Sequence, residues 1–233
     1  MKKSVIGLLI ATGVIGAVGV SGLIYLNSTP TVDVLPAEQV ILTPNELNNT
    51  DQTVLFNFVD ISQLDNQAEL YRQANLLRHT GSLTGGELTT QFKRATHAKM
   101  SYRFGRKKPT TFKPAVLTTM LPSGFVLTGR EYQGVLLDKK YTGMYRLFEN
   151  PNTKARLEIS EQQILANQPI TLVRELFNEK IGDVPVRLES FQDKKGVIYY
   201  SAEFAHQDKY YTISSKGMEK FTVLALLEQL LSQ

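Results

Sequence analysis

Cysteine is absent from the 233 residues, and histidine occurs only three times. Without cysteine the chain forms no disulfide, thiolate metal site or catalytic thiol, and it cannot carry the lipid of an acylated lipoprotein. His79, His97 and His206 are too far apart for the i, i+4 pair of a helical zinc site, and we interpret His206 as a solvated turn residue. The sequence therefore predicts no metal ion and no cofactor.

Recognisable enzyme motifs are missing as well. The chain has no G-x-S-x-G elbow, no S-x-x-K acyl-serine motif and no P-loop. A glycosidase pair of carboxylates stays open, because the fold rather than the spacing sets such a pair. Glu158 and Glu161 are most simply interpreted as a solvated strand end. We therefore expect a protein that is not an enzyme.

Charged residues are missing from Ser4–Leu26, a run of 23 residues that follows Lys2 and Lys3. As a helix with a rise of about 1.5 Å per residue it would reach roughly 34 Å, enough for a bilayer core of about 30 Å. Since positive charge favours the cytoplasmic side, we expect a cytoplasmic stub at 1–3 and a transmembrane anchor at 4–26. The rest of this single-pass protein would lie outside the cytoplasmic membrane, in the periplasm or at the cell surface.

A cleaved signal peptide is the alternative interpretation of this run, because small residues spaced for cleavage follow its first half. The apolar residues continue past those sites, which favours the uncleaved anchor. Gly13, Ala17 and Ser21 recur at i, i+4 and i+8, a spacing that lets transmembrane helices pack closely. Small residues are common in membrane helices, so the same spacing is also expected without a packing partner.

Charge is strongly segregated along the rest of the chain. Residues 31–87 carry eight acids and two bases, whereas residues 88–130 carry nine bases and no acid. Bases with interleaved aromatic residues are typical of polyanion binding, and the candidate contacts are Lys93, Arg94, Lys99, Arg103, Arg106, Lys107, Lys108 and Lys113. Outside the cell we expect anionic lipid, a cell-wall polyanion or an acidic protein rather than nucleic acid. Pairing with the acidic region of the same chain and a solvated linker are the alternatives.

The pattern divides the chain after the anchor into three parts. Residues 27–87 read as an acidic extended arm with a short strand at Gln39–Leu42 and an amphipathic helix at Ile61–His79. Asp60 is the candidate N-cap of that helix and Gly81 its stop. Thr53–Val59 is either a strand or the start of a helix. Residues 88–117 form the basic connecting segment.

Residues 118–233 predict an α+β domain, an antiparallel sheet with helices packed on one face. The alternating segments predict strands at Phe125–Tyr132, Gly134–Leu137, Gly143–Phe148, Ala155–Ser160, Val184–Phe191, Val197–Ala205 and Lys209–Ser215. Helices are expected at Ile170–Ile181 and Glu219–Leu231, the second with Phe221 in its apolar stripe. The tyrosines of the last two strands, Tyr199, Tyr200, Tyr210 and Tyr211, are expected to pack across the sheet rather than to stack on a ligand.

This region resembles the extracytoplasmic domains of anti-sigma-factor regulators and of lipoprotein-carrier-like sensor proteins. The resemblance rests on Leu121-Pro122-Ser123-Gly124-Phe125, on the run Val197–Gly217 and on the closing helix Leu224–Leu231. An anti-sigma factor needs a cytoplasmic domain to hold its sigma factor, but only 1–3 precede the predicted anchor. The resemblance therefore implies a sensor or accessory subunit.

Together these features predict a non-enzymatic binding or regulatory protein of the bacterial cell envelope whose partner is another envelope or membrane protein, or a polyanion. A structural subunit of a secretion, pilus or division assembly is the first alternative, with an edge strand that accepts a partner strand. A cell-wall hydrolase without a recognisable motif is the second.

Overall fold

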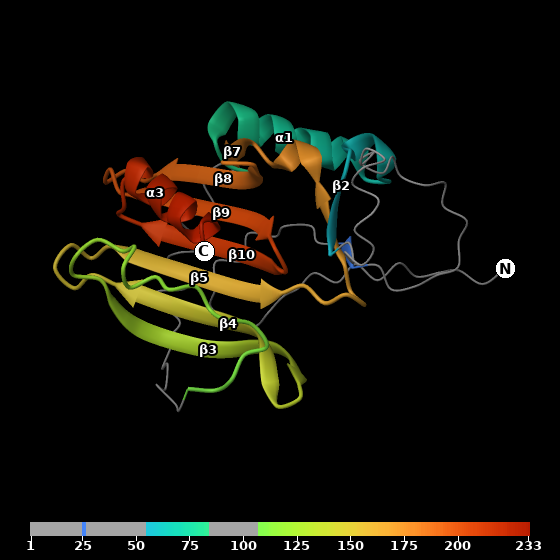
Figure 1. Cartoon of the computed structure of the whole chain (residues 1–233). Coiled ribbons are helices and arrows are strands. Elements are labelled where there is room, and N and C mark those ends of the chain that lie inside the picture. The colour runs from blue at the N-terminus through green and yellow to red at the C-terminus, as the bar shows by residue number, and fades with distance from the viewer. Residues whose placement is uncertain (1–24, 27–54, 84–106) are drawn as a thin grey trace.

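The computed structural model describes residues 25–26, 55–83 and 107–233 (Figure 1). The predicted strand at 39–42, the small-residue spacing of Gly13, Ala17 and Ser21, and most of the predicted anchor lie outside these residues. The last two anchor residues, Tyr25–Leu26, form the short strand β1 instead of helix. No helix in the described part of the chain is both long and apolar enough to span a membrane.

A seven-stranded sheet, antiparallel throughout, forms the centre of the molecule, in the order β3-β4-β5-β10-β9-β8-β7. Its strands are β3 (Val126–Leu137), β4 (Lys140–Glu149), β5 (Arg156–Gln163), β7 (Glu179–Ile181), β8 (Val184–Gln192), β9 (Ile198–His206) and β10 (Lys209–Lys216). The predicted α+β class and the meander from β8 to β10 are confirmed. The two strands predicted at 125–137 are one strand, β3, with register shifts.

The helix α3 (Lys220–Leu231) covers one face of this sheet, which we call the first face (Figure 1). Its buried side chains pack on apolar residues that share a face of β5, β8, β9 and β10. The helix contributes Val223, Leu226, Leu227 and Leu230. The prediction of this helix is confirmed, but Phe221 is wrong as a core residue because it is 81% exposed.

A second layer packs against the opposite, second face of the sheet. It contains β2 (Phe56–Val59), the 3-10 turn η1 (Ile61–Gln63), α1 (Gln67–Thr80) and β6 (Ile170–Val173), which pairs in parallel with β2 and antiparallel with β1. Leu70, Ala74 and Leu77 of α1 share a buried cluster with Tyr199 of β9. The prediction of a helix that stops at Gly81 is confirmed, but the helix begins at Gln67, and Asp60 is wrong as its N-cap because it caps the separate turn η1. The two helices also do not lie on one face of the sheet, because Tyr199 points away from α3.

The helix predicted at Ile170–Ile181 is wrong. This stretch forms β6, the 3-10 turn η2 (Arg174–Leu176) and β7. All four residues of β6 are buried, as in a strand covered on both sides, and three of them are β-branched. The helical spacing of its apolar residues therefore arises from two strands and a turn that face different neighbours.

The four tyrosines of β9 and β10 are buried, which confirms the predicted packing. The ring of Tyr211 stacks on Phe204 with their centroids 4.8 Å apart. The expected turn after β4 is also present, because Asn150 Oδ1 accepts hydrogen bonds from the backbone N–H groups of Asn152 and Thr153. His206 is not in a turn. It ends β9 and is partly buried, and burial followed by the charge of Lys209 lowers its pKa.

Candidate functional site

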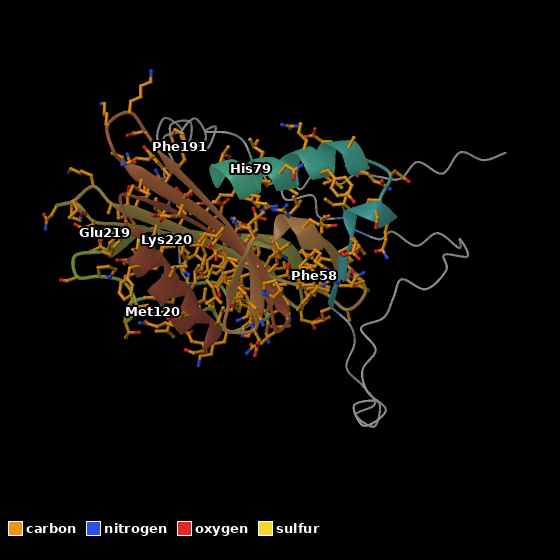
Figure 2. The ribbon with its side chains drawn as sticks, turned by 90° about the horizontal axis from the view of Figure 1, so that it is seen from above. Phe58, His79, Met120, Phe191, Glu219 and Lys220 are labelled. Atoms are coloured by element: carbon orange, nitrogen blue, oxygen red, sulfur yellow. The ribbon has the colours of Figure 1, made fainter. Side chains whose placement is uncertain are left out.

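The end of α1 and the start of α3 lie at the same end of the sheet, beside β7 and β8. Figure 1 shows both ends near β7, and Figure 2 marks them by His79 on α1 and by Glu219 and Lys220 at α3. The two helices come from opposite faces, so the short edge strand β7 separates them only partly. This arrangement leaves a cleft between α1, β7–β8 and α3.

The α1 side of the cleft is fixed by hydrogen bonds to β8. The backbone N–H of Ser190 donates to the carbonyl of Gly81 at 2.7 Å, and the carboxylate of Glu189 accepts from the backbone N–H of Leu83 at 2.7 Å. Gly81 has a φ of 72°, and a Cβ there would lie 3.2 Å from Ser190 Oγ. Glycine is therefore required for the chain to leave α1 and turn onto the sheet.

The β7 side is fixed by the side chain of Asn178. Its Oδ1 accepts from the backbone N–H of Leu188 at 2.9 Å, and its Nδ2 donates to the Leu188 carbonyl at 3.0 Å. These two bonds attach the residue before β7 to β8 and so hold Glu179, the first residue of β7, at the cleft.

The cleft has a volume of about 310 Å³. Its lining residues divide into a buried, mainly apolar floor (Leu77, Leu188 and Tyr200) and an exposed polar rim (Arg78, Glu179, Ser190 and Lys220). Lys220 Nζ lies 3.8 Å from Glu179 Oε1, whereas Arg78 makes no ion pair with any described residue. Burial, and then the charge of Glu219, raises the pKa of Tyr200, so the floor stays neutral.

Sequence reasoning missed these residues because they come from positions about 140 residues apart in the chain. The sequence predicts Gly81 as a helix stop, but nothing in the spacing of Arg78, Ser190 and Lys220 indicates that these residues line the same cleft. The fold alone brings them together.

The basic segment predicted as a polyanion site is described only in part. Lys93, Arg94, Lys99, Arg103 and Arg106 lie outside the described residues, whereas Lys107, Lys108 and Lys113 are exposed. Lys108 Nζ lies 3.3 Å from the hydroxyl of Tyr141 on β4. None of the three joins an ion pair within the described part of the chain, and none of them lines the cleft between α1 and α3.

Two acids of the predicted acidic arm pair with bases outside the basic segment. Asp60 pairs with Arg174 of η2 at 2.9 Å, and Glu69 pairs with Arg72 within α1 at 2.6 Å. Pairing between the arm and the basic segment is therefore not seen in the described residues.

Glu158 and Glu161 are not at a solvated strand end, so that prediction is wrong. Both are buried, because β5 is a central strand with neighbours on each side. Glu161 pairs with Arg146 at 2.5 Å on the first face, and Glu158 pairs with Arg156 at 2.8 Å on the second. Burial raises the pKa of Glu158, although Arg156 and the hydroxyl of Tyr145 oppose the shift.

A second buried charge cluster lies on β8 and β9. Arg187 pairs with Glu203, which also accepts a hydrogen bond from the hydroxyl of Tyr210, and Glu189 lies 3.9 Å from Arg187. Burial opposes the charge of Arg187, but Glu203, Tyr210 and Glu189 together raise its pKa, so it remains protonated. At most 4% of any of these charged side chains is exposed, which makes the cluster part of the interior rather than a surface site.

Comparison with known proteins adds no relative, because no family model, curated protein or solved structure matches the chain.

Proposed function

We propose that this chain is a non-enzymatic, membrane-anchored binding or regulatory protein of the bacterial cell envelope, and that the cleft between α1 and α3 holds a short segment of another envelope protein. The observation that carries the proposal is the cleft itself, a concave site with an apolar floor and a polar rim. Sites that bind ligands have this composition, with a few polar groups that fix the orientation of an apolar occupant.

The size and charge of the cleft define the occupant. A volume of about 310 Å³ accommodates one or two side chains of an extended peptide. The floor favours an apolar side chain, and burying it supplies most of the affinity. Arg78 and Lys220 outnumber Glu179 on the rim, which favours a carboxylate next to the apolar side chain.

The alternatives find less support in the described residues. A hydrolase that used Glu158 and Glu161 would need both carboxylates to be accessible, but each is enclosed and lies beside an arginine. An assembly subunit that accepts a partner strand would need a long, regular sheet edge. The edge strand β7 has three residues and the edge strand β3 has two register shifts, features that protect edges from pairing.

The membrane anchor and the extracytoplasmic location belong to the same proposal. They are supported by the 23 uncharged residues after Lys2 and Lys3. The resemblance of residues 118–233 to extracytoplasmic sensor domains supports the regulatory role in the same way.

Photo-crosslinking in living cells tests the cleft as a contact site. A photoreactive amino acid at Ser190, on the rim, in the tagged full-length chain is expected to give one discrete protein adduct. The same amino acid at Lys195 is the matched control, because Lys195 is exposed in the turn after β8 and does not line the cleft. Equal adducts from both positions, or an adduct only from Lys195, would contradict the proposal.

A further inference from the structure

The β3–β4 hairpin carries the most prominent exposed apolar group on the sheet. It projects from the edge formed by β3 (Figure 1), and three consecutive side chains near its turn, Val135, Leu136 and Leu137, are 50%, 55% and 42% exposed. Isolated exposed apolar residues are ordinary, but three in a row at a projecting tip indicate an interaction surface.

Hydrogen bonds within the sheet fix the conformation of this tip. The backbone N–H of Val135 donates to Thr142 Oγ1 at 2.9 Å, and Gln162 Nε2 donates to the same oxygen at 3.0 Å. Gly134 has a φ of 77°, and a Cβ there would lie 2.2 Å from Thr142 Oγ1. A β-bulge fixed by hydrogen bonds, and not fraying of the strand end, therefore accounts for the exposure of the three apolar residues.

Lysines surround the tip. Lys139 belongs to its turn and Lys140 begins β4, and residues 109–111 bond to the backbone of Tyr141, which brings Lys107 and Lys108 beside the hairpin. Lys108 Nζ lies 5.1 Å from the centre of the Tyr141 ring. The one acid of the turn is Asp138, and none of these charges joins an ion pair with another described residue.

We propose that this hairpin inserts Val135, Leu136 and Leu137 into the surface of an anionic bilayer, with the four lysines among the lipid headgroups. Apolar side chains at the acyl boundary, with basic side chains next to them, are the combination that binds a protein to an anionic membrane surface. Tyr141 and Tyr132, whose rings lie 5.7 Å apart behind the tip, are the amphipathic rings expected at headgroup level.

The dimensions of the tip favour a bilayer over a second protein. A stable protein interface takes about 20–30 residues on each side, and a tip of three apolar residues between lysines presents far fewer. A bilayer needs no shape complementarity and accepts a projecting tip, and its anionic headgroups neutralise the lysines. This site is separate from the cleft, and the inference does not depend on the function proposed for the cleft.

A single tryptophan tests the insertion directly, because the chain contains none. The Leu136→Trp variant of the full-length chain is reconstituted into vesicles of phosphatidylglycerol and phosphatidylcholine. We expect a blue shift of its emission and quenching by brominated acyl chains. Val126→Trp is the matched control, since Val126 is 51% exposed at the other end of the same strand, and its emission should stay that of an indole in water.

The lysines give the second arm of the test. Adding Lys139→Gln and Lys140→Gln to Leu136→Trp should lower the ratio of inserted to free tip about 25-fold, at about fivefold per lysine. Vesicles of phosphatidylcholine alone should lower this ratio further, because they lack the anionic headgroups that attract all four lysines. Equal quenching of the two tryptophan variants would overturn the proposal. So would a blue shift that follows protein concentration in the absence of lipid, because that result indicates pairing of two copies.

Discussion

Both faces of the central sheet are covered by other elements, but their side chains differ in chemistry. On the first face, beneath α3, apolar side chains from β5, β8, β9 and β10 fill the space, and Arg146 with Glu161 is the only buried ion pair that we find among its described residues. On the second face, two cross-strand rows run over β4, β5, β10, β9 and β8. They are Leu147, Glu158, Ser214, Ser201 and Glu189, and next to them Tyr145, Ser160, Thr212, Glu203 and Arg187.

This difference separates stability from specificity. Apolar burial on the first face stabilises the fold with little directional requirement. Buried ion pairs on the second face gain little net stability, because desolvation opposes their attraction, but they penalise any arrangement that separates the partners. The same face fixes Leu83 through Glu189, and so sets where α1 ends and where the cleft opens.

The largest effect is expected on the first face. Phe204 is fully buried and stacks on Tyr211, so Phe204→Ala should lower the free energy of unfolding by about 3–5 kcal/mol. Urea denaturation followed by circular dichroism measures the loss. A change below about 1 kcal/mol would show that this face is not the core.

Removing one partner of a buried ion pair on the second face should lower the free energy of unfolding nearly as much. Arg187→Met leaves Glu203 and Glu189 buried without their cation, so we expect a loss of about 3 kcal/mol. Replacing both partners, with Arg187→Met and Glu203→Leu together, should recover most of it. The exposed pair of Glu69 and Arg72 is the control, and Glu69→Gln should not change the urea midpoint measurably. A double variant no more stable than Arg187→Met would contradict this account.

A smaller effect should appear with pH. The pKa of Glu158 in the folded chain is raised, because burial disfavours the carboxylate. The folded state therefore holds this proton more tightly than the unfolded chain, and the contribution of Glu158 to stability grows as the pH falls from neutral towards 4.5. As the pH is lowered from 7 to 5, the free energy of unfolding of the chain should rise relative to that of its Glu158→Gln variant. The opposite trend would show that Arg156 outweighs burial.

The sequence predicted the elements whose signals are local. The strands β8, β9 and β10 alternate and are separated by short polar turns, and α1 and α3 have apolar stripes with a glycine stop or a clear start. The sequence did not predict β6 as a strand, because its pairing partner, β2, lies more than 110 residues earlier in the chain. A strand held by so distant a partner leaves no mark in its own periodicity.

The second face shows another limit of pattern reading. Arg187 and Glu189, or Ser201 and Glu203, alternate with apolar residues as they would on a solvated face. Only the layer over that face and the cross-strand register turn these positions into buried pairs. The cleft could not be predicted for the same reason, because the fold, and not a sequence motif, brings Arg78 and Lys220 to the same cleft.

The affinity of the cleft for its captured partner tests the central claim most directly. With the segment identified by crosslinking at Ser190, its dissociation constant is measured for the full-length chain and for the Arg78→Gln, Lys220→Gln double variant across a range of salt concentrations. We predict about tenfold weaker binding and a shallower salt dependence for the variant, because both cations lie on the rim. Equal dissociation constants and equal salt dependence would show that the partner binds elsewhere.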